Sequence, residues 1–133
     1  MKNKNNIRVI LADDHTLVRR GIRRILEKAT DICVIGEADT GMAALKLVME
    51  LEPDVLVLDI EMPDMMGIHV AQELRTNQVP ISIIILSACD DHYFIEQTLR
   101  IGVDGYVKKS ESPARIREMI HQVWNKYPVP IPT

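Results

Sequence analysis

The sequence predicts an α/β fold in which a parallel sheet of five strands has helices on both faces. Strand and helix patterns alternate five times along 133 residues, with helices of about ten residues between the strands. Residues 55–58 are a continuous apolar run without polar alternation, which indicates a strand buried on both faces. Hydrophobic residues make up 47% of the chain, enough for one domain with a core and too many for a disordered chain.

The five expected strands are bounded by residues that break strands. They cover 7–12, 32–38, 55–59, 81–86 and 105–108. An unpaired carboxylate inside the third strand would be costly, so Asp59 is expected where that strand emerges from the core. In an open parallel sheet this carboxyl end is where ligands bind. Asp59 is therefore the best single candidate for chemistry.

Helical spacing of apolar residues places a helix after each strand. The first helix is expected to bury Leu17, Gly21, Ile22, Ile25 and Leu26, with Asp14 or Asp13 capping its start. The next three cover 43–51, 68–75 and 90–100; Ile68, Ala71 and Leu74 face inward on the second of these, Ile95 and Leu99 on the third, and Gly102 closes the third. The last begins at Ser112 and Pro113 and buries Ile116, Met119, Ile120 and Val123.

Composition excludes several classes of protein. The formal net charge of −3 provides no electrostatic basis for non-specific nucleic-acid binding. The polar start and the short apolar runs predict neither a signal peptide nor a membrane span, so we expect a cytoplasmic protein. Cys33 and Cys89 form no metal or redox motif and are interpreted as buried free thiols. The four histidines, His15, His69, His92 and His121, lack metal-ligand spacing and are interpreted as surface or core residues.

The first helix also has a basic side. Arg19, Arg20, Arg23 and Arg24 form a face that is expected to be solvated, with docking of a kinase or a second protomer as the alternative.

Parallel strands bring polar residues of different strands to one edge. Asp13 and Asp14 follow the first strand, Asp59 the third, Ser87 the fourth and Lys109 the fifth. Three neighbouring carboxylates repel one another and need a cation, and an all-oxygen ligand set favours Mg²⁺. A hydroxyl and an ammonium beside them suit the oxygens of a phosphoryl group. This combination predicts in-line attack by Asp59 on phosphorus to form an aspartyl phosphate.

Four segments resemble the receiver domain of two-component response regulators. They are Leu11-Ala12-Asp13-Asp14-His15, Val57-Leu58-Asp59-Ile60-Glu61-Met62-Pro63, Ile85-Leu86-Ser87-Ala88 and Gly105-Tyr106-Val107-Lys108-Lys109, in family order and at family spacing. The resemblance implies a flavodoxin-like (βα)5 fold with strand order 2-1-3-4-5. The segments His15-Thr16-Leu17-Val18-Arg19-Arg20-Gly21, Gly36-Glu37-Ala38 and Leu51-Glu52-Pro53-Asp54 are similar to the branch with a LuxR-type helix-turn-helix output domain.

The resemblance also implies a role for each residue of the site. Asp59 would be the phosphoacceptor, and a histidine kinase or a small acyl phosphate would be the donor. Mg²⁺ would be bound by Asp14, Asp59 and the backbone carbonyl of Glu61, with Asp13 acting through water. Ser87 and Lys109 would contact the phosphoryl group, whereas the adjacent Lys108 should point to the other face. Tyr106 would be the switch residue that turns inward with Ser87, or else an aromatic residue that only packs.

Several positions depart from the family pattern. Met66 replaces a common small polar residue before Gly67, and Ser110 stands where this branch usually has an acidic residue. Glu61 and Cys89 occupy positions that tune dephosphorylation, so the lifetime of the phosphorylated state stays open. We expect a receiver domain over 1–127 and a linker stub over 128–133, in a protein cut before its DNA-binding domain; a receiver that acts alone is the alternative.

Two other functions compete with a phosphorylation switch that dimerises. One is a Mg²⁺-dependent phosphotransferase acting on small molecules, but such enzymes commonly have a second Asp where this chain has Glu61, and they need a cap domain. The other is a protein interaction module that is independent of phosphorylation. The acidic pair, Ser87 and Lys109 argue against that module. The switch itself would not be a conventional enzyme, although it promotes its own phosphorylation and dephosphorylation.

Overall fold

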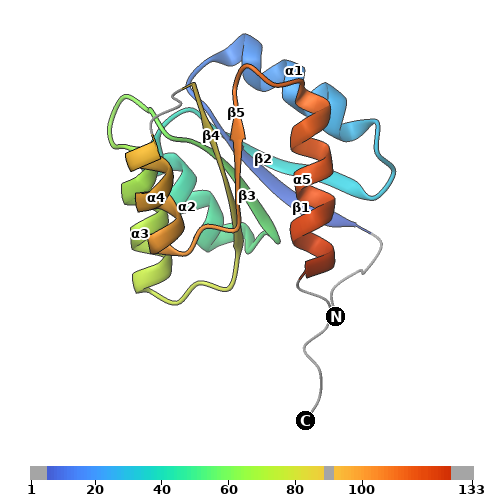
Figure 1. Ribbon diagram of the computed structural model, residues 1–133. Helices are drawn as coiled ribbons and strands as arrows, with labels where there is room; N and C mark the ends of the chain where they lie inside the picture. Colours follow the sequence, from blue (N-terminus) through green and yellow to red (C-terminus); the bar gives the residue numbers. More distant parts are fainter. Residues whose placement is uncertain (1–5, 89–91, 127–133) are drawn as a thin grey trace.

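The computed structural model describes residues 6–88 and 92–126 and shows five strands alternating with five helices (Figure 1). The elements are β1 (Ile7–Ala12), α1 (Thr16–Glu27), β2 (Ile32–Ala38), α2 (Gly41–Leu51), β3 (Val55–Asp59), α3 (Gly67–Thr76), β4 (Ser82–Ser87), α4 (His92–Ile101), β5 (Gly105–Lys108) and α5 (Pro113–Lys126). All strand pairs are parallel, in the order β2-β1-β3-β4-β5. The predicted fold class and strand order are therefore confirmed.

The sheet separates two hydrophobic cores. Alternation along each strand sends Leu56 and Leu58 of β3 to one face and Val55 and Val57 to the other. The first face packs against α2, α3 and α4, and the second against α1 and α5, as Figure 1 shows. Every residue of β3 is buried because this strand is central and covered on both sides. This explains why its sequence is uniformly apolar up to Asp59.

Several helical residues that were predicted to lie inward are not buried. Leu17 in α1 is 81% exposed, Leu99 in α4 is 55% exposed, and Gly21 in α1 is also exposed. Half-buried residues are Ile25, Ile68 and Ile95. The buried positions are instead Ile22 and Leu26 in α1, Val70 beside Ala71 and Leu74 in α3, and Thr98 in α4. The spacing of apolar residues along a helix does not by itself tell which side of the helix faces the sheet. The predicted inner face of α5 is confirmed for Ile116, Ile120 and Val123, and Met119 packs partly buried against them.

The prediction that Asp14 or Asp13 caps α1 is wrong. The N-cap residue is His15, and its side chain makes no capping hydrogen bond. Asp13 instead accepts a hydrogen bond from the His15 backbone N–H, at 2.9 Å to Oδ1. Both aspartates are therefore available to the carboxyl edge of the sheet instead of the helix. By contrast, Gly102 follows α4 with φ +97°, as predicted for a glycine that ends a helix.

The end of α2 shows how side chains from the sheet stabilise a helix terminus. Glu52 adopts a left-handed conformation with φ 48°, which is unusual for a residue other than glycine. Arg8 of β1 donates to the carbonyls of Glu52 and Leu51, both at 2.8 Å. These bonds satisfy carbonyls that a helix leaves unpaired at its end. They also attach α2 to the strand that leads to Asp13.

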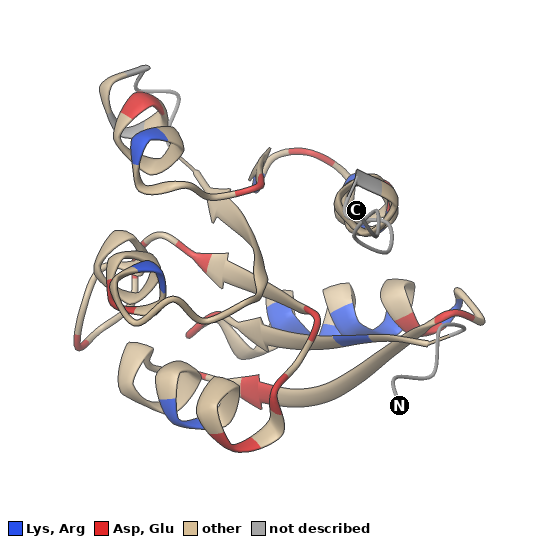
Figure 2. Cartoon of the chain, turned by 90° about the horizontal axis from the view of Figure 1, so that it is seen from below, with Lys and Arg blue, Asp and Glu red and all other residues tan. Residues whose placement is uncertain are grey.

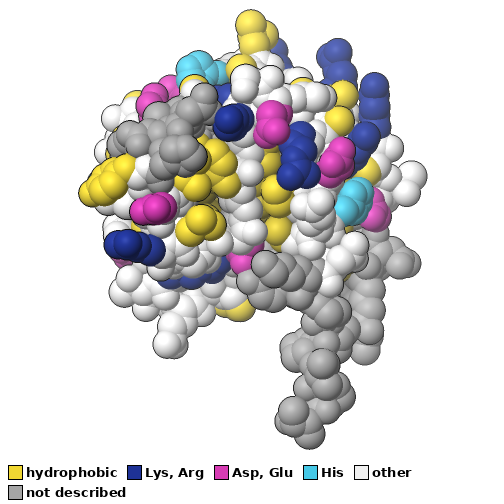
Figure 3. All heavy atoms as spheres, viewed as in Figure 1, with side chains coloured by type: hydrophobic (Ala, Val, Ile, Leu, Met, Phe, Trp, Pro, Cys, Tyr) yellow, Lys and Arg dark blue, Asp and Glu magenta, His cyan; other side chains and the backbone are white. Residues whose placement is uncertain are grey.

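The surface corrects two further expectations. Cys33 lies on the edge strand β2 and is exposed rather than buried, while Cys89 lies outside the described residues. The arginines of α1 (Figure 2) are only partly a solvated face, since Arg19 and Arg23 both donate to Glu37 of β2. Basic and acidic side chains alternate over α5 in Figure 3, so this face has no single sign of charge. Among the described residues, no helix is long and apolar enough to cross a membrane.

Candidate functional site

The carboxyl edge of the sheet gathers the predicted residues from four strands. Asp13 directly follows β1, Asp59 and Ser87 are the last residues of β3 and β4, and Lys109 directly follows β5. Backbone hydrogen bonds continue past the strand ends, from Asp13 N–H to Ala38 at 3.0 Å and from Lys109 N–H to Ser87 at 2.8 Å. The side chains are therefore placed by the rigid sheet rather than by loose loops.

The two faces of the sheet divide these residues into two groups. Asp59 and Lys109 extend the α1/α5 face, because Val57 and Val107, two positions earlier, lie in that core. Ser87 and Tyr106 belong to the α2/α3/α4 face, since Ile85 precedes Ser87 by two positions and Tyr106 packs against that core. Lys108 shares this parity and is exposed, which agrees with its predicted direction away from Lys109. The charged pair Asp59 and Lys109 and the pair Ser87 and Tyr106 thus approach the edge from opposite faces of the sheet.

Asp59 and Lys109 form a buried ion pair. The distance from Lys109 Nζ to Asp59 Oδ2 is 2.7 Å, and the side chains are 17% and 2% exposed, respectively. Burial, reinforced by the nearby charge of Asp13, raises the pKa of Asp59 to about 6 even though Lys109 opposes the shift. Burial disfavours the charged form of Lys109, but the hydrogen bonds to Asp59 and Asp13 and the charges of these two residues together outweigh burial and raise the pKa of Lys109. The site therefore holds a carboxylate that benefits from further positive charge.

Asp13 is held in its ionised form although it is almost fully buried. Burial works against its charge, yet the His15 N–H and the ammonium of Lys109 outweigh burial and lower its pKa. Lys109 Nζ lies 3.2 Å from Asp13 Oδ2, an atom that is buried and accepts no hydrogen bond. Asp14 Oδ1 is likewise buried without a hydrogen bond. Unsatisfied carboxylate oxygens that converge on one point are suited to a cation.

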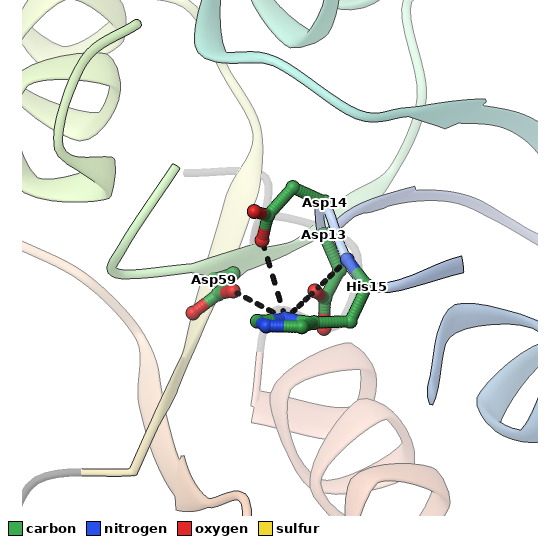
Figure 4. Close-up of side chains that lie close together, drawn as sticks. All are labelled: Asp13, Asp14, His15 and Asp59. Atoms are coloured by element: carbon green, nitrogen blue, oxygen red, sulfur yellow. Dashed lines mark hydrogen bonds and ion pairs between the residues drawn. The ribbon is translucent and has the colours of Figure 1, made fainter. Parts of the chain in front are cut away.

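His15 lies within this cluster, which its sequence context did not predict. One ligand atom from each of Asp13, Asp14, His15 and Asp59 lies within 4.8 Å of the others. Figure 4 shows the imidazole lying across the three carboxylates. The only signal in the sequence was the position of His15 directly after Asp13 and Asp14. The spacing of residues does not predict the direction in which a side chain at the start of a helix points. The interpretation of His15 as an ordinary surface or core residue is therefore incomplete.

The loop between β3 and α3 closes against the cluster. The backbone N–H of Glu61 donates to Asp59 Oδ1 at 3.2 Å, while the Glu61 side chain is exposed. Asp64 attaches the loop to the start of α2 by accepting hydrogen bonds from the N–H groups of Gly41 at 2.7 Å and Met42 at 2.9 Å, which lowers the pKa of Asp64. At Gly67, an added Cβ would lie 2.3 Å from the carbonyl oxygen of Asp59. Only glycine permits the chain to pass this close to the site.

The donor set fits a hard divalent cation. Carboxylate oxygens are the ligands that Mg²⁺ prefers, and two of the oxygens here are buried without a hydrogen bond. Ser87 is fully buried at the same edge, and Tyr106 is half-buried on β5. The arrangement thus combines a buried carboxylate, a cluster of further carboxylates that could hold a cation, an ammonium and a hydroxyl. These are the groups that phosphoryl transfer to a carboxylate requires.

Comparison with known proteins agrees with this arrangement. The sequence model of the response regulator receiver domain matches residues 9–121. The chain belongs to this family. Members of the family bind Mg²⁺ at an acidic pocket, and the receiver domain described here has its aspartate cluster at the corresponding edge. Receiver domains are signalling domains rather than conventional enzymes.

Several relatives share most of this receiver domain. It is 35% identical to the response regulator GacA of Pseudomonas aeruginosa over 118 residues and 32% identical to the nitrate/nitrite response regulator NarL of Escherichia coli K12 over 122 residues, covering 89% and 92% of the chain. The chain spans 55% and 56% of the length of these two relatives.

Solved structures agree with the fold. The receiver domain of a putative NarL from Mycobacterium tuberculosis superposes with a TM-score of 0.87 at 35% identity, covering 91% of this chain and 98% of that one. A LuxR-family response regulator from Staphylococcus aureus superposes with a TM-score of 0.86 at 32% identity, covering 90% and 99%. The predicted similarity to receivers of the LuxR-type branch is therefore confirmed.

Proposed function

We propose that this receiver domain is a phosphorylation switch in which Asp59 accepts a phosphoryl group with the help of Mg²⁺. The observation that supports this best is the buried Asp59–Lys109 pair, 2.7 Å apart, beside the unsatisfied oxygens of Asp13 and Asp14. A purely structural ion pair would not need two further carboxylates at its side. This proposal assigns the general function of the family to individual residues of this chain.

The transfer itself moves one phosphoryl group. A carboxylate oxygen of Asp59 forms a bond to phosphorus, and the P–N bond of a phosphohistidine or the P–O bond of an acyl phosphate breaks, with the electron pair leaving on the donor. Lys109 then exchanges part of its contact with Asp59 for the phosphoryl oxygens, which carry more charge. Asp14, Asp59 and the backbone carbonyl of Glu61 would hold Mg²⁺, and Asp13 would contribute through water. The ion would neutralise charge on the transferring group.

Ser87 and Tyr106 convert the chemistry into a change of surface. Both belong to the α2/α3/α4 face of the sheet, opposite in parity to Asp59 and Lys109. When the Ser87 hydroxyl moves toward the phosphoryl group, Tyr106 turns inward, and the face formed by α4 and β5 changes shape. The same site promotes loss of the phosphoryl group to water, so the domain regulates its own signal.

The partners follow from the family and its relatives. A histidine kinase is the phosphoryl donor, and the phosphorylated receiver forms a homodimer. This chain spans 55% and 56% of the response regulators GacA and NarL, and one similar solved structure is a DNA-binding response regulator of the LuxR family. We therefore propose that the output is DNA binding through a helix-turn-helix domain and regulation of transcription. The switch is proposed to act in the cytoplasm.

Intact mass after incubation with acetyl phosphate tests the acceptor. The wild-type chain should gain one phosphoryl group only when Mg²⁺ is present, and Asp59→Asn should gain none. Asp39→Asn is the matched control, since Asp39 is exposed near the same edge, just after β2. Equal gain in wild type and Asp59→Asn would refute the assignment, and no gain in any chain would favour an interaction module without phosphorylation.

A further inference from the structure

The imidazole of His15 occupies an unusual place in the aspartate cluster. Its Nδ1 lies 3.0 Å from Asp13 Oδ1, 3.2 Å from Asp14 Oδ1 and 3.8 Å from Asp59 Oδ2. These are the three side chains that the proposed cation would need, and Figure 4 shows all of them converging on the same ring nitrogen. The nitrogen therefore lies among the ligand atoms rather than behind them.

The distances match those within a coordination shell. Neighbouring ligands of an octahedral cation bound at about 2.1 Å are separated by about 3 Å. Nδ1 is at this separation from one oxygen of Asp13 and one of Asp14. Asp13 is almost fully buried, and its Oδ2, which accepts no hydrogen bond, lies 3.2 Å from Lys109 Nζ.

The ring of His15 makes its contacts within the cluster, where Nδ1 is at hydrogen-bond distance, 3.0 Å, from Asp13 Oδ1. His15 is the N-cap of α1, but its side chain makes no capping bond. Its backbone is held by the N–H bond to Asp13 Oδ1, and the side chain is 59% exposed, which leaves the ring able to adjust. Lys109 Nζ, 3.3 Å from Nδ1, is the positive group that now faces the ring, and a divalent cation would take over this part of its role.

We propose that His15 is a direct ligand of the divalent cation through Nδ1. The imidazole selectively strengthens the binding of metal ions that favour nitrogen ligands, such as Ni²⁺ and Co²⁺. Mg²⁺ gains little from an imidazole, whereas imidazole nitrogen suits the later transition metals. This inference rests on the metal site of the proposed function and adds a nitrogen ligand to it. The affinity of the receiver for a divalent ion would then depend on whether that ion favours nitrogen or oxygen ligands.

Calorimetric titration with Ni²⁺ and with Mg²⁺ tests the proposal. In His15→Ala the Ni²⁺ affinity should fall by at least about tenfold, the lower end of what even an outer-shell partner of a metal contributes. The Mg²⁺ affinity should change by less than about threefold, because its ligands are oxygens. The control His121→Ala removes the only other described imidazole paired with a carboxylate, Asp31, at the opposite edge of the sheet, and it should leave both affinities at the site unchanged.

A spectroscopic readout separates direct ligation from an indirect effect. In Co²⁺-loaded wild type, the proton spectrum should contain one strongly shifted, exchangeable ring N–H signal, absent from His15→Ala. His15→Ser, with a residue preferred at N-cap positions, should lose the same signal and keeps the test valid if the alanine variant folds poorly.

Three results would overturn the proposal. If Ni²⁺ and Mg²⁺ affinities fall in equal proportion in His15→Ala, or if neither changes, His15 is not a ligand. If the shifted N–H signal persists in His15→Ala, another group supplies it. After either of these results, loss of Ni²⁺ and Mg²⁺ binding in Asp14→Asn would show that the proposed metal site is correct although His15 is not a ligand. If wild type binds neither ion, the metal part of the proposed function fails together with this inference.

Discussion

At the scale of single residues, the site is governed by how buried charges compensate one another. Lys109 serves two buried carboxylates at once, at 2.7 Å from Asp59 and 3.2 Å from Asp13. Its ammonium supplies positive charge to both carboxylates. Removing one partner of a buried ion pair leaves the other charge uncompensated, which costs far more than the net value of the pair.

Lys109→Ala should therefore lower the free energy of unfolding by about 3 kcal/mol without Mg²⁺. Saturating Mg²⁺ should recover part of this loss, since the cation compensates the same carboxylates. Urea unfolding with and without Mg²⁺ measures both effects, with Lys108→Ala, exposed on the other face of β5, as the control. A loss of stability in Lys109→Ala that Mg²⁺ does not reduce would contradict this role.

Two glycines form a matched pair at the residue scale. A Cβ at Gly67 would lie 2.3 Å from the Asp59 carbonyl oxygen and 2.9 Å from the Ile60 Cα, both backbone atoms that cannot easily move. At Gly21 in α1 a Cβ would meet nothing within 4 Å.

Gly67→Ala should lower the free energy of unfolding by about 1–3 kcal/mol through overpacking and should reduce phosphorylation of Asp59. Gly21→Ala should raise the free energy of unfolding by about 0.5–1 kcal/mol, because it favours helix. Denaturant titration of both variants measures this contrast. Similar stability of the two variants would show that the approach of the loop to Asp59 is not tight.

At the scale of elements, α1 is attached to the edge strand by a charged network. Glu37 of β2 accepts hydrogen bonds from Arg19 and Arg23 of α1, and Arg23 also pairs with Glu27. Arg19 further donates to the backbone carbonyl of Asp13 at 2.6 Å. Burial alone would raise the pKa of Glu37, but the two guanidinium groups outweigh it and lower the pKa. The network therefore connects the helix start to the segment that positions Asp13.

The depressed pKa of Glu37 predicts a pH dependence of stability. The carboxylate stabilises the folded state above its unfolded pKa, near 4.5, and the contribution is lost as pH falls through the lower folded value. Glu37→Gln should be about 1 kcal/mol less stable than wild type at pH 7, and the difference should shrink below about pH 4. Urea unfolding at several pH values checks this, and a difference that does not vary with pH would contradict the charged role.

The sequence predicted elements better than it predicted their inward faces. The limits of β1, β2 and β5 agree with prediction because residues such as Asp13 and Asp39 stop each strand where the core ends. Leu17 and Leu99 were assigned to the core because apolar spacing cannot tell which of two neighbouring stripes meets the sheet. The positions of Asp59 and Lys109 at one edge followed from parallel topology, whereas His15 could not be predicted because its contacts depend on side-chain direction.

At the scale of the whole molecule, the buried charge cluster costs stability, and a bound cation would offset part of that cost. The raised pKa of Asp59 shows that burial disfavours its charge. A ligand that binds only the folded state stabilises it by mass action, by about 1.4 kcal/mol at ten times its Kd.

Mg²⁺ should consequently raise the melting temperature of the wild-type domain by about 3–6 °C at that concentration. Asp14→Asn should show little or no such increase, because it removes a proposed ligand. Thermal unfolding followed by circular dichroism measures the shift. An equal rise in both proteins would place Mg²⁺ somewhere other than this edge.

The most direct test of the phosphoacceptor is to locate the modification. Borohydride reduces an aspartyl phosphate to homoserine, so tandem mass spectrometry of peptides after phosphorylation and reduction identifies the residue. We predict homoserine at position 59, only in samples that contained Mg²⁺. Homoserine at position 13 or 14 instead, or its absence from chains that had gained a phosphoryl group, would contradict Asp59 as the acceptor.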